Sequence, residues 1–485
     1  MLEIWTNSRA LAHAGGVQQW DSARVAMTAL DASEVCRLLG RWTTGSATLT
    51  DDLVTALVEL IDAGLMPAGA LLPPQRRLAT ALLVSRGTVT SAYEALEARG
   101  YLATNRGSGS RVRSARSQLH GRPSGRLFSF TSAPADVIDL STGALPASPI
   151  AADVLGRPRS DLAAYLATDG YFPAGLPVLR QAIADQYTRD GLPTRPQQIL
   201  VTSGAQQATW LAVTSLAGSG DLVLTEEPTY RGALEVLRST DARAEGIPLA
   251  GGGLDVEQVR HALGRKPQAL FCQTAIHNPT GRSMRDSTRH ELAELINEAG
   301  LTTIEDTCSA DLTLTGAPVA RTLAGLLDPE LLVTVGSTSK LFWGGIRIGW
   351  IRASEARVHG LVELRKAVDL ASSVADQLVA VELIGRTEQA RHQRRTMLTE
   401  ALAATEAELR CAYPEWHWNP IDGGSGLWVD TGQDAVALAE RGKRAGVRVA
   451  AGPSFSTYDG QRTFLRLPVW HEPTMLRAGL TALNS

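Results

Sequence analysis

The amino-acid sequence predicts a multidomain protein in which a small, basic α+β domain precedes a larger α/β domain. Three observations lead to this prediction. The chain has 485 residues, which is too long for one compact core. A block of arginines lies within residues 64–126. From about Ile138 onward, short apolar runs rich in β-formers alternate with helical stretches, as is typical of an α/β domain.

The composition indicates an ordinary soluble protein. Hydrophobic residues make up 44% of the chain and the net charge is −3. No apolar run approaches the length of a membrane span, and residues 1–15 lack the features of a signal peptide, so we expect a cytoplasmic location and no membrane partner. The cysteines are scattered without a CxxC pair, which predicts reduced thiols and no metal site. They are Cys36, Cys272, Cys308 and Cys411.

The charge is distributed unevenly. Residues 64–126 contain ten arginines and only two carboxylates, Glu94 and Glu97, a local balance of +8 in a slightly acidic chain. A basic block inside a neutral protein indicates a polyanionic partner.

The first helix of the small domain is expected after an N-terminal extension, residues 1–49, in which only Glu34–Trp42 looks helical. Thr50 is a plausible N-cap, and apolar residues then recur at helical spacing until Gly64. These residues are Leu53, Val54, Leu57, Val58 and Ile61.

Two more helices and a hairpin complete the small domain. Gln75–Leu82 follows Pro73-Pro74, and Ser85 would cap a third helix that runs to Gly100. The strands expected around the turn NRGSG cover residues 101–104 and 110–113. The buried stripe of the third helix is Val89, Ala92, Tyr93 and Leu96. This order of elements is that of a winged helix-turn-helix, whose third helix presents its start to the major groove of DNA.

A small accessory domain with solvated arginines is the alternative. The concentration of arginines on the second helix, the third helix start and the hairpin favours double-stranded DNA. The stretch LPPQRRLATALLVSRGTVTSAYEALEARGYLATNRGSGSRV resembles the GntR family of winged helices, over residues 53–112. The resemblance implies a DNA-binding domain at 50–113 with DNA contacts from Arg76, Arg86, Thr88 and Arg106, of which Arg86 and Thr88 would reach base edges. Residues 114–137 are rich in Ser, Arg, Gly and Pro and are expected to be a linker.

Lys340 is the most informative residue of the larger domain. It follows the apolar strand Leu331–Val335 and the hydroxyl-rich turn Gly336-Ser337-Thr338-Ser339, and Arg347 lies seven residues further on. An amine near hydroxyls and a guanidinium is what an aldehyde cofactor bearing a phosphate requires. From this stretch alone, a lysine that only extends to the surface is an equal alternative.

Other strand ends carry polar residues too. The expected strands Ile199–Thr202, Leu222–Thr225, Ala269–Gln273 and Thr302–Glu305 are each followed by such a group. The groups are SGAQ with Gly204 and Ala205, EEPTY with Tyr230, HNPTG with Asn278, and Glu305-Asp306. Ligands of open α/β sheets bind at the carboxyl ends of the strands, where these residues would gather.

The motifs SGAQQA, EEPTY, HNPTG, SxSK and GGIRIGW, in this order, resemble fold-type I aminotransferases over about residues 140–483. The combination with a winged helix resembles the MocR-type subfamily of GntR regulators. The resemblance implies a pyridoxal 5'-phosphate-dependent transferase fold at 138–485, with a small C-terminal α+β subdomain at about 385–485, and a homodimer.

The resemblance also assigns roles to residues. Lys340 would form the internal aldimine, Asp306 would hold the pyridine nitrogen, Asn278 would donate to the ring oxygen and Tyr230 would stack on the ring. Arg466, in TFLRLPV, would bind an effector carboxylate. The phosphate would be held by Gly204, Ala205, Ser337, Ser339 and Arg347, with Tyr171 reaching the phosphate of the partner subunit.

One position departs from the family pattern. A tyrosine usually stands two residues after the aspartate, and here Cys308 takes that place. A thiol is a poor hydrogen-bond donor, which counts against full transaminase activity but not against cofactor binding.

Three functions are compatible with the sequence. The first is a transcriptional regulator that senses pyridoxal phosphate, or an amine or amino acid effector, through aldimine chemistry at Lys340. The second is an active aminotransferase with a fused DNA-binding domain, since Lys340, Asp306 and Arg466 are all present. The third is a regulator in which the aminotransferase-like part only dimerises.

Overall fold

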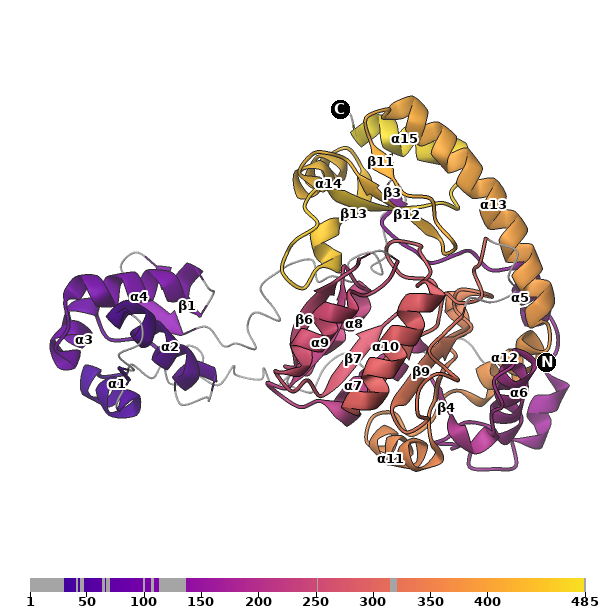
Figure 1. Cartoon of the computed structure of the whole chain (residues 1–485), viewed down its shortest axis with the longest axis horizontal. Coiled ribbons are helices and arrows are strands. Elements are labelled where there is room, and N and C mark those ends of the chain that lie inside the picture. Colours follow the sequence, from indigo (N-terminus) through magenta and orange to yellow (C-terminus); the bar gives the residue numbers. More distant parts are fainter. Residues whose placement is uncertain are drawn as a thin grey trace, which may run out of the picture. The chain divides into compact units, whose positions relative to one another are not determined.

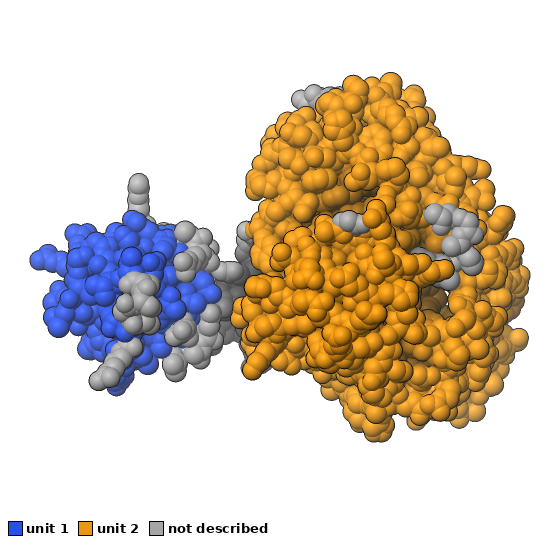
Figure 2. All heavy atoms as spheres, in the orientation of Figure 1, with its two compact units in different colours: residues 1–124 blue, residues 125–485 orange. Residues whose placement is uncertain are grey.

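The computed structural model of the chain divides into two compact units, residues 1–124 and residues 125–485 (Figure 2). The structure describes residues 30–40, 42–43, 48–62, 66, 70–98, 101–105, 109–112, 137–250, 252–314 and 321–483. Across these ranges, no helix is both long and apolar enough to cross a membrane.

The first unit is a four-helix domain with a two-stranded hairpin. Its core residues include Val35, Leu57, Leu78 and Leu96, each fully buried. The strands are antiparallel, with Leu102 opposite Val112. The elements are α1 Ala32–Leu39, α2 Leu49–Asp62, α3 Gln75–Leu82, α4 Arg86–Ala98, β1 Leu102–Asn105 and β2 Gly109–Val112.

These elements confirm the winged helix-turn-helix. The expected second helix is α3, and the Ser85 hydroxyl accepts a hydrogen bond from the Thr88 backbone N–H at 3.0 Å, as an N-cap should. The expected cap at Thr50 is wrong. Thr48 is the residue whose hydroxyl accepts from the Asp51 backbone N–H, at 3.2 Å, because the helix already begins at Leu49.

The second unit is built on a seven-stranded mixed sheet with helices on both faces (Figure 1). The strand order is β4-β10-β9-β8-β7-β5-β6, and only β10 runs antiparallel to its neighbours. The strands are β4 Ile199–Thr202, β5 Leu222–Glu227, β6 Arg243–Pro248, β7 Ala269–Cys272, β8 Thr303–Asp306, β9 Leu332–Ser337 and β10 Gly349–Arg352.

Apolar clusters on the two sides of the sheet explain its burial. Leu211 and Leu361 pack on one side of the central strands, and Val259 and Leu292 pack on the other. Such two-sided coverage is what the nearly continuous apolar runs predict. The helices that surround the sheet are α5 Pro149–Leu155, α6 Pro177–Arg189, α7 Ala205–Leu216, α8 Arg231–Ser239, α9 Val256–Leu263, α10 Asp286–Ala299, α11 Glu355–Lys366 and α12 Val374–Ile384.

A smaller five-stranded sheet, of order β11-β12-β14-β13-β3, forms the rest of the second unit. Its strand β3, Ile138–Leu140, comes from the start of the unit and pairs in parallel with β13. The long helix α13, Thr387–Ala412, runs from the region of α5 and α12 to α15 (Figure 1). The remaining elements are β11 His417–Trp418, β12 Gly426–Asp430, α14 Ala435–Arg444, β13 Val447–Ala451, β14 Phe464–Pro468 and α15 Pro473–Leu483.

Candidate functional site

Polar residues gather where the parallel strands of the large sheet end. Asp306 is the last residue of β8, and Lys340 follows the end of β9 by three residues. Tyr230 and Asn278 lie in the loops after β5 and β7. The strands β5, β7, β8 and β9 are consecutive neighbours in the sheet, so these four residues come from one edge of it.

Asp306 is a buried acid held by two hydrogen bonds. One oxygen accepts from the Cys308 backbone N–H at 2.9 Å and the other from Gln273 Nε2 at 3.1 Å. Burial raises the pKa of Asp306, while the hydrogen bonds from Cys308 and the charge of Lys340 act against that rise. A buried carboxylate is stabilised by a cationic hydrogen-bond donor, and a protonated pyridine nitrogen is such a donor.

Lys340 lies close enough to Asp306 for the two charges to affect each other. Its Nζ donates to the Gly143 carbonyl at 2.7 Å. Burial, and to a lesser extent the charge of Arg466, lower the pKa of Lys340 to about 8, against the opposing effects of Cys308 and Asp306. A substantial fraction of the amine is therefore neutral near physiological pH, and the neutral amine is the form that attacks a carbonyl carbon.

This pKa predicts how cofactor capture depends on pH. We expect the rate at which Lys340 captures pyridoxal phosphate to rise up to about pH 8 and then to level, because the neutral form is then dominant. An ordinary lysine, with a pKa of about 10.4, would keep accelerating to about pH 10. Stopped-flow absorbance across this range measures the profile, and a curve that follows the ordinary lysine would contradict the prediction.

The start of α7 forms a backbone cradle beside these residues. Gly204 has a φ of +96°, and a Cβ there would lie 2.6 Å from Arg347 Nη2. Arg347 itself is left-handed, with a φ of 57°, and its Nη2 donates to the Ser203 carbonyl at 2.7 Å. At Gly349 a Cβ would lie 2.7 Å from the Ala205 backbone nitrogen. The helix start thus presents free N–H groups next to a guanidinium, which suits a phosphate.

Two hydroxyls adjoin the lysine turn. Ser337 Oγ donates to Ser339 Oγ at 2.8 Å, and the Ser339 backbone N–H donates to Ser337 Oγ at 3.0 Å. The amine of Lys340, the buried acid Asp306, these hydroxyls and the glycine cradle are the donor set that pyridoxal phosphate requires. The residues present therefore fit this cofactor.

Tyr230 and Asn278, which the sequence predicts to contact the cofactor ring, each have a hydrogen-bond partner in the structure. Tyr230 Oη donates to Gln206 Oε1 at 3.2 Å, and its ring lies where a Cβ on Gly232 would be only 2.4 Å away. Burial raises the pKa of Tyr230, and the nearby charge of Asp306 raises it further. The Asn278 backbone N–H donates to Gln273 Oε1 at 3.2 Å, so Gln273 contacts both the asparagine loop and the buried acid.

Arg466 occupies a narrow slot in the small sheet. A Cβ on Gly143 would lie 2.5 Å from its Nη2, and one on Gly426 would lie 2.7 Å from its Cζ. Nη2 donates to Ser425 Oγ at 3.1 Å, while Nη1 is buried and has no hydrogen-bond partner among the described residues. Burial lowers the pKa of Arg466 to about 9, and the charge of Arg231 contributes to that shift. A fixed guanidinium with an unused donor suits a carboxylate.

Sequence reasoning missed four residues of this site. Gln273 donates a hydrogen bond to Asp306, and Ser425 accepts one from Arg466. The Gly143 carbonyl accepts a hydrogen bond from Lys340. Arg231 is 4% exposed and donates to the Ser141 carbonyl at 3.1 Å. Its position directly after Tyr230 in EEPTYR was an available signal, whereas the others depend on contacts between distant parts of the chain.

Tyr171 and Cys308 are two further residues that the sequence singled out. Tyr171 is 60% exposed, so its contact with the phosphate of a partner subunit stays a prediction. Cys308 does lie beside Asp306, and burial raises the pKa of its thiol, with the charge of Asp306 adding to the rise. The thiol is therefore neutral at physiological pH, and Cys308 offers the ring only a weak donor.

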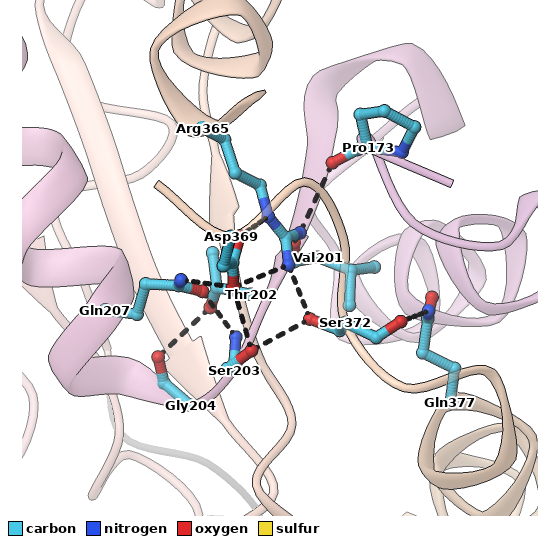
Figure 3. A network of polar contacts seen from close by, with 10 residues as sticks. All are labelled: Pro173, Val201, Thr202, Ser203, Gly204, Gln207, Arg365, Asp369, Ser372 and Gln377. Carbon is cyan, nitrogen blue, oxygen red and sulfur yellow. Dashed lines mark hydrogen bonds and ion pairs between the residues drawn. The ribbon is translucent and has the colours of Figure 1, made fainter. Parts of the chain in front are cut away.

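A polar network supports the phosphate cradle from behind (Figure 3). Arg365 is fully buried, and its guanidinium donates to the Val201 carbonyl, to Ser372 Oγ at 2.7 Å and to Asp369 Oδ1 at 3.0 Å. Asp369 Oδ2 accepts from Gln207 Nε2 at 2.6 Å. The network fixes the start of α7 to the loop after α11, so the cradle is formed before any ligand binds.

The expected DNA contacts lie in the first unit. Arg76 on α3 and Arg86 at the first position of α4 are exposed. Thr88 is half-buried, and its hydroxyl shares a 2.9 Å hydrogen bond with Ser85. Arg106 lies outside the described residues. The two exposed arginines are therefore available to a polyanion, while the Thr88 hydroxyl already contributes to the helix cap.

Comparisons with known families agree with both halves of this description. Residues 135–483 match aminotransferases of class I and II, and residues 49–112 match the gntR family of bacterial regulatory proteins. The fold and its site define a winged-helix protein joined to an aminotransferase-type unit. The chain belongs to the class I and II aminotransferase family and, with its GntR domain, to the MocR-type regulators.

Individual relatives include both regulators and enzymes. The HTH-type transcriptional regulator YisV of Bacillus subtilis is 29% identical over 387 residues, covering 74% of this chain and 79% of the relative. The 2-aminoadipate transaminase of Thermus thermophilus is 29% identical over 62% of this chain and 76% of its own. The structure of Pyrococcus horikoshii kynurenine aminotransferase has a TM-score of 0.67 at 24% identity, covering 76% and 95% of the two chains.

Proposed function

We propose that this protein is a DNA-binding transcriptional regulator whose second unit binds pyridoxal phosphate and senses an amine or amino acid through Lys340. The observation that carries the proposal is the combination, in one chain, of a basic winged helix with Lys340 and the buried side chains of Asp306 and Arg466. The similarity to HTH-type transcriptional regulators supports the same reading.

Each residue has a definable task at this site. Pyridoxal phosphate, when bound, supplies an aldehyde that condenses reversibly with primary amines. Lys340 offers a partly neutral amine, Asp306 holds the ring nitrogen, and the Gly204–Ala205 cradle with Arg347 binds the phosphate. Arg466, with its unused Nη1, binds the carboxylate of an amino acid. An amino acid effector would therefore compete with Lys340 for the aldehyde of the cofactor, while Arg466 holds the carboxylate of the effector.

Regulation further requires that the effector bind two arrangements of the protein with different affinities, since equal affinity shifts no equilibrium. We expect a homodimer to present two winged helices to two half-sites of an operator.

The proposal is tested by selecting bound sequences from a random DNA pool, then measuring affinity for the selected site with and without cofactor and each amino acid. A change in affinity for a subset of amino acids supports sensing, and identical affinities in all conditions contradict it.

Arg86 provides a direct test of the DNA surface. We expect Arg86→Ala to weaken binding to the selected site about ten-fold or more, because a specific base contact contributes roughly 1–3 kcal/mol. Arg37→Ala is the matched control, because Arg37 is 77% exposed and lies on α1, which is not the expected recognition helix. Fluorescence anisotropy at several salt concentrations measures both. Equal losses in the two variants would mean that α4 does not enter the groove.

An active aminotransferase is the second candidate. The presence of the amine, the acid and the carboxylate clamp favours it, and Cys308 counts against it. Steady formation of a 2-oxo acid from an amino donor, in the purified protein and not in Lys340→Ala, would establish the enzyme. A spectral response to amino acids without such product would favour the regulator.

A further inference from the structure

Lys340 and Arg466 are joined by a chain of three hydrogen bonds. Arg466 Nη2 lies 3.1 Å from Ser425 Oγ, and Ser425 Oγ lies 2.9 Å from the Gly143 carbonyl oxygen. The same carbonyl accepts from Lys340 Nζ at 2.7 Å. The chain connects the end of β9 in the large sheet to β12 and β14 in the small sheet. The Lys340 amine and the Arg466 guanidinium are thereby connected through Ser425 and the Gly143 carbonyl.

The direction of every hydrogen bond in this chain is fixed. A guanidinium is only a donor, so Ser425 Oγ accepts from Arg466. The single hydroxyl proton of Ser425 is then directed to the Gly143 carbonyl, which is only an acceptor. Gly143 has two lone pairs, and Ser425 and Lys340 use both. Donors that share one carbonyl weaken each other, so the hydroxyl reduces the capacity of this oxygen to hold an ammonium.

Geometry prevents the chain from relaxing easily. Ser425 is 5% exposed, and Arg466 lies between Gly143 and Gly426, where any Cβ would collide with the guanidinium. Because Ser425 engages Nη2, the buried Nη1 is the donor left for a ligand. Ser425 thus sets both the orientation of the clamp and the environment of the amine.

We infer that Ser425 is a positioning residue that couples recognition of a ligand carboxylate at Arg466 to the state of the Lys340 amine. The inference rests on the proposed function for its biological meaning, and on the three hydrogen bonds for its physical content. It makes the regulator selective for amines that carry a carboxylate over amines that do not. When Lys340 is not bonded to the cofactor, the Gly143 carbonyl accepts a hydrogen bond from its amine. A ligand carboxylate bound to Arg466 acts on this carbonyl through Ser425.

The first test needs no cofactor. Competitive acetylation of the cofactor-free protein, followed by peptide mass spectrometry, gives the pH profile of each lysine. In Ser425→Ala the Gly143 carbonyl loses its second donor, so we expect the reactivity of Lys340 to move to higher pH, because the ammonium is better held. The substitution removes none of the other groups that act on this amine, which are Arg466, Asp306, Arg231 and Cys308.

Matched controls make the result specific. Ser454→Ala removes a hydroxyl that donates to the carbonyl of Ala451, three residues earlier, at 2.7 Å. This variant should leave the pH profile of Lys340 unchanged. Lys366, which is paired with Glu363 on the surface, serves as the internal reference. An unchanged Lys340 profile in Ser425→Ala, in a protein with normal thermal unfolding, would overturn the inference whatever the fate of the proposed function.

The second test uses the cofactor-loaded protein and compares amino acids with the matching amines that lack the carboxylate. We expect Ser425→Ala to weaken the spectral response to the amino acids about ten-fold or more, because Arg466 loses a hydrogen bond made by a charged group. The response to the amines should change less, because they place no carboxylate on Arg466. An equal preference in wild type and variant would overturn the inference, and no response to either class in wild type would instead overturn the proposed function.

Discussion

Replacement of Lys340 by alanine is expected to abolish covalent capture of pyridoxal phosphate. Lys340 is the amine that burial leaves partly neutral, with a pKa of about 8, and it lies beside Asp306. In wild type, borohydride should fix the cofactor to the protein in nearly one-to-one ratio, because it reduces the reversible bond to an amine. In the variant, incorporation should fall to background. Intact-protein mass spectrometry after borohydride treatment measures the ratio.

Lys366→Ala is the control for this substitution. Lys366 is an exposed lysine whose Nζ lies 2.7 Å from Glu363 Oε1. Its removal should leave incorporation at the wild-type value. Undiminished incorporation in Lys340→Ala would show that another lysine reacts, and would remove the basis for the effector mechanism.

Replacement of Gly349 by alanine is expected to destabilise the protein and to weaken cofactor binding. A Cβ at this position would lie 2.6 Å from the Gly204 carbonyl carbon and 2.7 Å from the Ala205 backbone nitrogen. Both neighbours are backbone atoms of the phosphate cradle, which cannot rotate away as a side chain can. We expect the free energy of unfolding to fall by about 2–3 kcal/mol, at the upper end of overpacking costs. Cofactor affinity should fall as well, because the cradle is displaced.

Gly344→Ala provides the matched comparison five residues earlier in the chain. No atom lies within 4 Å of a Cβ there. Its unfolding midpoint and cofactor affinity should stay close to those of wild type. Thermal unfolding and cofactor titration of the two variants distinguish the effect of close backbone packing at Gly349 from the general effect of replacing a glycine. If both variants behave alike, the cradle is not tightly packed around Gly349.

The sequence was sufficient for the fold because its signals were local. The strand Ile199–Thr202 and the helix Gln75–Leu82 follow from apolar periodicity and turn residues, and both appear with the expected bounds. Lys340 and Asp306 could be placed at one edge because the strands that carry them are parallel neighbours. The cap of α2 was misplaced because Thr48 and Thr50 are chemically equal and only the backbone distinguishes them.

What the sequence could not supply were contacts between distant segments. Gly143, whose carbonyl accepts a hydrogen bond from Lys340, lies 197 residues from it in the sequence. No sequence pattern near either residue indicates this contact. The Arg365 network likewise joins positions 164 residues apart. Each of these contacts depends on how elements of the second unit that are distant in sequence pack together, which is a property of the whole fold.

The small sheet contains one strand that the sequence places far from the others. Strand β3, Ile138–Leu140, is the first described element of the second unit and is hydrogen-bonded to β13. The first described strand of the second unit therefore belongs to the sheet that carries Arg466, not to the sheet that precedes Lys340. A displacement of the small sheet relative to the large sheet would carry the start of the described second unit with it.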